Sequence, residues 1–512
     1  MDERGSRVGL DPIHRVFMME NHDDAYHIWR DAGVKQRVLI HIDAHHDMWW
    51  VTDANSITIA NFICPALKDD IVREIFWVVP DLTWKTSRSR RPILRHVRKI
   101  AESYPGVRHA LEVGTNQIST VVLGKPLRIC SLASLPRIDE SVLLDIDSDF
   151  LVIPRVSYQE SDEHGALPWC WPDELLAPLQ ARHIRADVVT IAYSVEGGYT
   201  PLKWKYLGDE LALRLKQPNH GEPTFQGMGL IREAALAAHR GDLVTAEKKY
   251  HEAGNLLPSS GAPYYHLAHL YVEMGRIGDG QKFYQRALAL DASYRTAYNS
   301  AGLHYHSESR LRAAEQEYRR TLALDPQDPY AHFGLGRLAA QRRRWSEAEA
   351  LLRKSLALDG HLIDAYRALG DVLVKLGRCE EAIGAYEQSL KLALAGYKPL
   401  EGPIATYANG DRLVDPDHCR VHARLARLYE LKGATTDAIS GYRISIAGGY
   451  DRVLLRSRLA HLFLKQNQWQ NAAEETWQAL RRIPVDLRKA GRRLLRHMRL
   501  VNKGGYQALL AP

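Results

Sequence analysis

The C-terminal part of the 512-residue chain repeats itself with a period of 34 residues. Small residues recur at this spacing in one column, which consists of Ala246, Gly280, Ala314, Ala348 and Ala382. Large residues recur at the same spacing in a second column, which consists of Tyr250, Tyr284, Tyr318, Leu352 and Tyr386. Small residues permit close helix approach and large ones fill a core, so each period predicts one helix–turn–helix unit that stacks on its neighbours.

This pattern resembles the tetratricopeptide repeat over residues 222–486. The resemblance implies an all-α solenoid with a concave groove for peptides. The period breaks once, because Ala382 and Ala438 are 56 residues apart, which is 34 plus 22. The extra segment is rich in Gly, Pro and Asp, and it predicts a loop inserted near residues 395–416. Residues 487–512 are predicted to form a basic capping helix and a tail.

Residues 1–212 follow a different pattern, in which short apolar runs alternate with helical stretches. The runs are RVFMMENH, RVLIHIDAHHD, EIFWVVPD, PLRICS, SVLLDIDSD and DVVTIAYSVEGG. Their Val and Ile content, with little polar alternation, indicates strands buried on both faces. Strand–helix alternation predicts a separate α/β domain with a parallel sheet, and ligands of such sheets bind at the carboxyl ends of the strands.

Two clusters of polar side chains follow predicted strands. The first comprises Asp43, His45 and Asp47 in HIDAHHD, and the second comprises Asp145, Asp147 and Asp149 in LLDIDSDF. Alternate residues of an extended segment point the same way, so each cluster converges on one place. Packed carboxylates repel one another, and divalent cations offset the repulsion. Either cluster alone also fits solvated loop residues, but the two together predict a metal site with oxygen-rich ligands suited to Mn²⁺.

These motifs resemble the ligand pattern of the ureohydrolases, the arginase and agmatinase group, whose α/β fold is shared with histone deacetylases. The resemblance implies two Mn²⁺ ions. It implies that Asp43 and Asp145 bridge the ions, that His45 and Asp147 bind one of them, and that Asp47 binds the other.

The resemblance also implies a histidine after the first strand and a glutamate that pairs with a guanidinium group. His22 fits the histidine, although the family's preceding Gly-Gly pair is missing, and His27 competes from a predicted helix. Glu196 fits the glutamate, and its alternative role is that of a solvated turn residue. The family's proton-shuttle histidine has no match, and the candidates are His46, His109 and His164.

Several strings, including ENH, HIDAHHDMWW and EGGYTP, resemble a divergent branch that contains peptide arginases, over about residues 12–205. The resemblance implies a hydrolase that converts arginine side chains of a ribosomally made precursor peptide to ornithine and urea. Asp47 would orient the attacking water, Glu196 would anchor the guanidinium, and the repeats would recruit the peptide. The alternatives are a deacetylase-like amidohydrolase on the same fold and a non-catalytic repeat scaffold.

Composition sets outer limits on the function. Hydrophobic residues make up 45% of the chain and the formal net charge is +7, which neither requires nor excludes an acidic partner. The five cysteines are far apart and form no C-x-x-C pair, so we expect a reducing compartment. The charged N-terminus and the lack of a long apolar run predict a cytoplasmic protein without a membrane segment. Arginine-rich stretches are expected to be solvated helix faces and not nucleic-acid sites.

Overall fold

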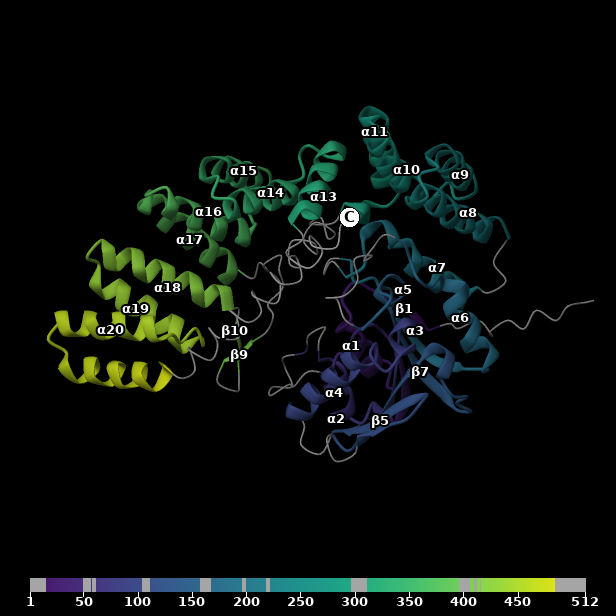
Figure 1. The fold of residues 1–512 in the computed structure, drawn as a ribbon, viewed down its shortest axis with the longest axis horizontal. Helices are drawn as coiled ribbons and strands as arrows, with labels where there is room; N and C mark the ends of the chain where they lie inside the picture. The colour runs from purple at the N-terminus through teal and green to yellow at the C-terminus, as the bar shows by residue number, and fades with distance from the viewer. Residues whose placement is uncertain are drawn as a thin grey trace, which may run out of the picture. The chain divides into compact units, whose positions relative to one another are not determined.

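The computed structural model describes residues 15–48, 57, 61–103, 111–156, 167–195, 199–217, 222–295, 311–395, 406–408, 412–414 and 416–483. The chain divides into two compact units, Met1–Arg342 and Arg343–Pro512 (Figure 1). None of the described helices is both long enough and apolar enough to cross a membrane.

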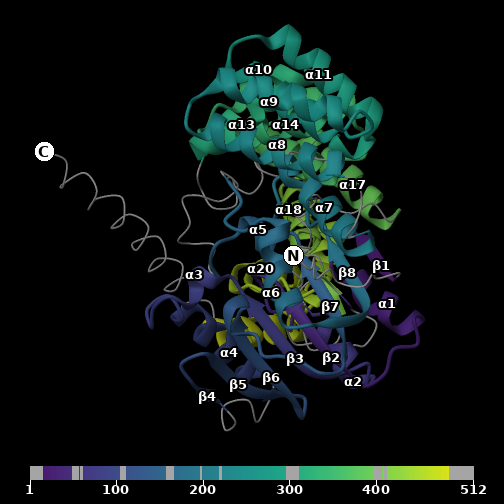
Figure 2. The ribbon, with the colours of Figure 1, turned by 90° about the vertical axis from the view of Figure 1, so that its right-hand side faces the viewer.

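The first unit contains an eight-stranded sheet with the order β1-β8-β7-β2-β3-β6-β5-β4 (Figure 2). The strands are β1 (Val16–Met19), β2 (Arg37–Ile42), β3 (Val72–Val79), β4 (Glu112–Val113), β5 (Gln117–Val122), β6 (Lys125–Ser131), β7 (Ser141–Asp147) and β8 (Arg185–Ala192). The first six strands in this order pair in parallel, as the sequence predicted. The pairs β6–β5 and β5–β4 are antiparallel, so the sheet is mixed at one edge, which the sequence pattern did not predict.

Helices cover both faces of the sheet. One face packs against α1 (Asp24–Asp31), α2 (Ile63–Lys68) and α4 (Arg91–Ser103). The other face packs against α5 (Asp149–Val152), α6 (Pro172–Ala181) and α7 (Tyr206–Lys216). The short helix α3 (Asp81–Trp84) follows β3. Because alternate residues of a strand point to opposite faces, Leu39 and Leu143 contribute to the first layer while Ile40 and Leu144 contribute to the second.

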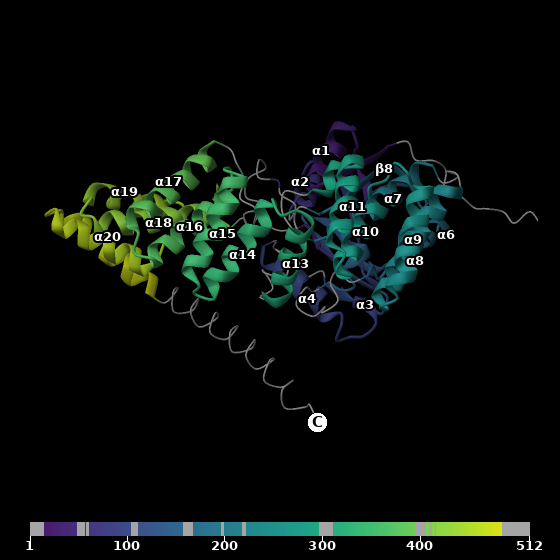
Figure 3. The same ribbon diagram turned by 90° about the horizontal axis from the view of Figure 1, so that it is seen from above.

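The predicted repeats are helical pairs in both units. The first unit contains α8 (Glu222–His239), α9 (Leu243–Leu256), α10 (Ala262–Glu273), α11 (Ile277–Leu290), α13 (Leu311–Leu324) and α14 (Pro329–Gln341). The second contains α15 (Trp345–Leu358), α16 (Ile363–Lys375), α17 (Cys379–Leu394), α18 (Pro416–Leu431), α19 (Thr435–Ala447) and α20 (Val453–Lys465), stacked in succession (Figure 3). Residues 469–483 are also helical.

The two sequence columns lie where the period placed them. Ala314, Ala348 and Ala382 are fully buried, and so are Tyr318 and Tyr386 of the large column. A Cβ atom on Gly370 would lie 2.5 Å from the Tyr386 ring, which explains the small residue at that position. The helical solenoid predicted from the period is therefore confirmed.

The predicted inserted loop contains a two-stranded antiparallel hairpin, β9 (Thr406–Ala408) and β10 (Arg412–Val414). This hairpin lies between α17 and α18, within the segment near 395–416 where the sequence predicted an insertion between repeats. The predicted cap and tail at 487–512 lie outside the described residues.

The sheet and the first repeats share one hydrophobic core. A single cluster of buried side chains extends from Val16 in β1 to Leu324 in α13. The junction is the 3₁₀ helix Leu202–Trp204, in which the Trp204 ring lies 5.4 Å from the His266 ring of α10. The sequence placed a domain boundary between residues 212 and 222, where the sheet domain gives way to the repeat helices. The hydrophobic core continues across that boundary.

Truncation tests this shared core. A chain ending at residue 221 would expose Trp204 and Tyr206, whose rings pack against His266 of α10, at a cost of about 1.5–3 kcal/mol for each large side chain. We expect it to aggregate or to melt at a much lower temperature than a chain ending at residue 342. Circular dichroism melts of both proteins check this, and equal melting temperatures would show that the sheet domain folds without the repeats.

Candidate metal centre

Strand register brings the polar residues of β2, β7 and β8 into one row. His41 of β2 pairs with Asp145 of β7, and Asp145 pairs with Thr190 of β8. All three side chains are fully buried. Asp43 follows β2 and Asp147 ends β7, so they lie one step further toward the carboxyl ends of the strands. The next strand after β2 in the chain, β3, lies on the side of β2 opposite β7, so the row sits at a point where the strand order reverses.

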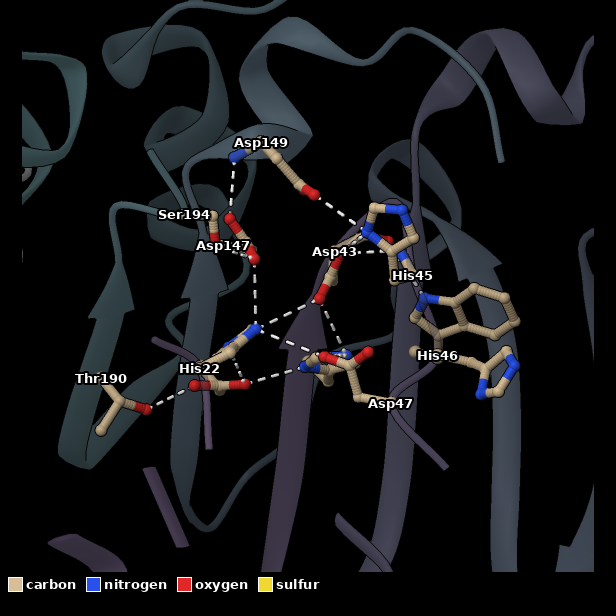
Figure 4. A network of polar contacts seen from close by, with 12 residues as sticks. His22, Asp43, His45, His46, Asp47, Asp147, Asp149, Thr190 and Ser194 are labelled. Carbon is tan, nitrogen blue, oxygen red and sulfur yellow. Dashed lines mark hydrogen bonds and ion pairs between the residues drawn. The ribbon is translucent and has the colours of Figure 1, made fainter. Parts of the chain in front are cut away.

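A first group of side chains surrounds one nitrogen of His22. His22 Nδ1 lies 3.3 Å from Asp43 Oδ2, 3.4 Å from Asp47 Oδ2 and 3.3 Å from Asp147 Oδ2 (Figure 4). Asp47 has a positive φ of 48°, a left-handed backbone conformation that is uncommon for residues other than glycine. Three carboxylates and one imidazole therefore face one another in a buried space.

A second group shares Asp43. His45 Nδ1 lies 3.3 Å from Asp43 Oδ1 and 2.9 Å from Asp149 Oδ2 (Figure 4). Asp43 therefore presents one carboxylate oxygen to each group. The His45 side chain is 29% exposed, whereas Asp43 and Asp149 are fully buried, so the second group lies nearer to solvent.

Asp145 lies within the sheet next to the first group, and both of its carboxylate oxygens contact neighbouring side chains. Thr190 Oγ1 donates to Asp145 Oδ1 at 2.5 Å, and His41 Nδ1 lies 2.8 Å from Asp145 Oδ2. His22 Nε2, the nitrogen that faces away from the other carboxylates, also lies 2.8 Å from Asp145 Oδ2. A carboxylate behind an imidazole fixes its ring orientation, as the partners of metal-bound histidines do.

Several buried polar atoms of the cluster make no hydrogen bond of normal geometry, although some of them lie within ion-pair distance of a neighbour. They are His22 Nδ1, His41 Nε2, Asp43 Oδ2 and both carboxylate oxygens of Asp149. Buried polar groups are rarely left without a hydrogen bond. Where they are, a site for a bound ion is one explanation. Imidazole and carboxylate donors without thiolates suit Mn²⁺ or a similar cation. The residues present therefore fit the predicted metal site.

The carboxylates of the cluster titrate abnormally in the absence of metal. Burial raises the pKa of Asp149 well above its usual range, and the charges of Asp147 and Asp43 add to this. Burial likewise raises the pKa of Asp47 to about 6, again with Asp43 adding to it. Burial would raise the pKa of Asp43 too, but His22 outweighs burial and holds that pKa well below its usual range.

The pKa values of His22 and His45 are raised, as are those of Asp47 and Asp149. Burial alone would lower the pKa of His22, but the adjacent Asp145 carboxylate outweighs burial and raises it well above its usual range. Burial also acts to lower the pKa of His45, and Asp149 reverses the effect. The carboxylates and imidazoles of the cluster therefore hold one another's protons, which offsets part of the negative charge that is buried there.

The structure brings together His22, Asp43, His45, Asp47, Asp145 and Asp147, which are all the metal ligands predicted from the sequence. His27, the competitor of His22, is exposed on α1. Glu196 lies outside the described residues, as do His109 and His164. His46 is buried, with its ring 5.8 Å from the Trp77 ring and 5.2 Å from the His96 ring.

Sequence reasoning missed two contributors. His41 precedes Asp43 by two residues, so the strand alternation that linked Asp43 to His45 also placed His41 on that face. Asp149 was part of the second motif but was given no ligand role. Tyr199 is a further neighbour, with its ring 5.2 Å from the His45 ring, and nothing in the sequence pattern singled it out.

The pKa shifts predict how stability depends on pH. His22, His41, His45, Asp47 and Asp149 have raised pKa values in the folded, metal-free protein, so the folded state binds more protons than the unfolded state. The histidines contribute to the free energy of unfolding in full when the pH is below their pKa in the unfolded state. This contribution is lost as the pH rises through their pKa in the folded state. We expect the melting temperature of EDTA-treated protein to fall as the pH rises above the usual histidine pKa of 6.5.

Manganese should remove this fall, because bound cations replace the protons. His46, whose pKa burial lowers, titrates below this pH range and does not oppose the effect. Differential scanning calorimetry of EDTA-treated and Mn²⁺-loaded protein checks both statements. An identical pH dependence with and without manganese would contradict the assignment of these groups to a metal site.

Comparisons with known proteins identify the repeats. Two family models described as tetratricopeptide repeat match the chain, one at residues 330–395 and the other at residues 265–329 and 367–449. Both lie outside the sheet, so the resemblance of the sheet domain to ureohydrolases stays a prediction from its motifs. None of the curated proteins matches the chain significantly.

Three solved structures illustrate the likeness. A Pseudomonas aeruginosa pilF structure is 17% identical, covers 52% of this chain and 95% of its own, and has a TM-score of 0.29. The Cut9–Hcn1 hetero-tetramer of APC/C is 14% identical, with coverages of 56% and 60% and a TM-score of 0.30. YrrB, described as a TPR protein with an unusual peptide-binding site, is 20% identical, with coverages of 41% and 97% and a TM-score of 0.26.

The two family matches and the 34-residue period identify the repeats. Tetratricopeptide repeats generally bind proteins or peptides. The C-terminal part of this protein is an array of tetratricopeptide repeats.

Proposed function

We propose that the sheet domain is a binuclear metal-dependent hydrolase and that the repeats bring a peptide or protein substrate to it. The observation that carries the proposal is the position of Asp43, whose two carboxylate oxygens face two separate groups of buried nitrogen and oxygen atoms. A carboxylate shared between two such groups is what a pair of cations requires, and a solvated loop would not bury it completely.

The geometry supports a revised set of ligand roles. The first cation would be held by His22, Asp43, Asp47 and Asp147, and the second by Asp43, His45 and Asp149. Asp147 and Asp149 thereby take the places that the family resemblance implied for Asp145 and Asp147. The physical reason is that β7 ends at Asp147, so Asp145 lies inside the sheet, where Thr190 and His41 occupy its oxygens.

The proposed reaction is hydrolysis of an arginine guanidinium. Two divalent cations would supply a water acidified enough to attack at neutral pH. Asp47, next to His22, would accept a hydrogen bond from that water and align it. Glu196, which follows β8 in the sequence, would pair with the guanidinium. Addition of water and cleavage of the bond between the guanidinium carbon and Nε give urea and leave the amine of ornithine, so the atoms balance.

Tyr199 favours a second candidate function. Its ring contacts His45, and burial raises the pKa of its hydroxyl, so it remains a hydrogen-bond donor at neutral pH. A phenol beside a metal ligand can stabilise a developing oxyanion, as amide hydrolysis on a deacetylase-like site requires. The guanidinium reaction remains our first choice because the two groups around Asp43 fit two cations.

Metal content tests the site. We expect about two Mn²⁺ per chain in the wild type, about one in Asp149→Asn, and none in Asp43→Asn, because Asp43 faces both groups. The exposed Asp139, which pairs with Arg137, supplies the control Asp139→Asn, which should keep both ions. Plasma mass spectrometry after dialysis measures the content. A folded wild type that cannot be loaded would exclude the site.

Substrate variants test the reaction. Glu196→Gln should keep both ions and lower turnover of an arginine-containing peptide at least about 100-fold, because it removes the charge that holds the guanidinium. Tyr199→Phe should have a smaller effect on that substrate. Peptide mass spectrometry detects loss of CN₂H₂ from arginine. Loss of an acetyl group from acetyl-lysine peptides, abolished by Tyr199→Phe, would favour the amidohydrolase instead.

A further inference from the structure

His41 is a fully buried histidine on β2 that has no place among the ligand roles given above. Its neighbours along the strand, Ile40 and Ile42, are fully buried apolar residues. An imidazole at such a depth is costly unless both of its ring nitrogens have polar partners. The surroundings of these two nitrogens therefore decide what the residue can do.

One ring nitrogen of His41 faces Asp145. His41 Nδ1 lies 2.8 Å from Asp145 Oδ2, and His22 Nε2 lies 2.8 Å from the same oxygen. Thr190 Oγ1 donates to the other oxygen, Asp145 Oδ1. One carboxylate oxygen therefore orients two imidazole rings, as carboxylate partners of metal-bound histidines do.

The second nitrogen of each ring faces the same two carboxylates. His41 Nε2 lies 3.4 Å from Asp43 Oδ2 and 4.0 Å from Asp47 Oδ2. His22 Nδ1 lies 3.3 Å and 3.4 Å from these two oxygens. His41, Asp43 and Asp47 each offer one ligand atom, and these three atoms all lie within 4.8 Å of one another. Both imidazoles are thus directed at one place.

A protonated His41 that pairs with Asp43 and Asp47 and binds no cation is the alternative. Charge-assisted hydrogen bonds between nitrogen and oxygen are about 2.7–2.9 Å long. His41 Nε2 lies further than this from both carboxylates and makes no hydrogen bond of normal geometry. Atoms that each lie about 2.0–2.2 Å from a shared cation are separated by roughly 3–3.5 Å. The separation of His41 Nε2 from Asp43 fits this second arrangement better.

We propose that His41 is a ligand of the first cation, beside His22, and that Asp145 is the shared carboxylate partner of both imidazoles. This inference rests on the proposed binuclear site and adds a difference between its two positions. The first cation has two imidazole ligands, whereas the second, among Asp43, His45 and Asp149, has one. Because nitrogen ligands favour Co²⁺ and Zn²⁺ over Mn²⁺, the first position takes up Co²⁺ before the second does.

Two substitutions separate a ligand from a residue that only supports the sheet. In His41→Asn, the amide nitrogen stands near the place of Nδ1 and can still donate to Asp145, but nothing reaches the place of Nε2. In His41→Gln, the amide oxygen can reach the place of Nε2 and bind a cation, while the contact with Asp145 is lost.

Competition titrations of the full-length protein with Co²⁺ and a chelator measure the effect. We expect His41→Asn to weaken binding of the first Co²⁺ at least about 100-fold, because even the outer partners of metal ligands contribute about 10–100-fold to affinity. His41→Gln should weaken it less than His41→Asn. The control is His27→Asn, the same substitution at an exposed histidine of α1, which should leave Co²⁺ binding unchanged.

The opposite order of the two variants, with wild-type affinity in His41→Asn, would overturn the inference. X-ray absorption of the wild type with one equivalent of Co²⁺ keeps it testable if both variants fail to fold. We expect two imidazoles on the bound ion, and a single imidazole would overturn the role of His41. Two bound ions with one imidazole each would refute this role and leave the binuclear site standing, whereas a folded wild type that binds no Co²⁺ would contradict both.

Discussion

Burial of aspartate carboxylates at the carboxyl edge of the sheet is the constraint around which the N-terminal domain is organised. Asp43, Asp145 and Asp149 are fully inaccessible to solvent, and Asp47 and Asp147 are nearly so. Isolated buried carboxylates are costly, so the fold must supply compensating charge. Three imidazoles supply part of it, two of them held by Asp145. The unsatisfied atoms of His22, Asp43 and Asp149 mark where further positive charge belongs.

The same edge is tied to the repeats by a short segment. Ser194 Oγ donates to Asp147 Oδ2 at 2.7 Å, and Tyr199 packs on His45. A few residues later, Trp204 and Lys205 are fixed against α10 and Asp291. The first repeats therefore act as part of the scaffold of the candidate site, because the segment that approaches the site is anchored on them. A purely modular arrangement of enzyme and docking array does not describe this junction.

Features that repeat along the chain were predictable from the sequence. Features that depend on how far each strand extends within the folded sheet were not. The 34-residue period predicted the helical pairs, and the alternation in HIDAHHD and LLDIDSDF predicted the converging ligands. That alternation could not tell which two of Asp145, Asp147 and Asp149 face the cation space, because the choice depends on where β7 ends relative to β2. His41 was overlooked because it lies within an apolar run. The antiparallel edge consists of two short hairpins, β4–β5 and β5–β6, of which the second turns at Leu123 and Gly124, so it was a local signal that the reading of the sequence overlooked. The shared core arises from long-range contacts that no local pattern encodes.

The central claim is that Asp43 lies between two cations. Anomalous diffraction from crystals soaked in Mn²⁺ tests it most directly, because each ion produces its own peak. We expect two peaks about 3.5–4 Å apart on either side of the Asp43 carboxylate, one beside His22 and the other beside His45. A single peak coordinated by Asp145, or no peak in a soaked crystal of the folded protein, would contradict it.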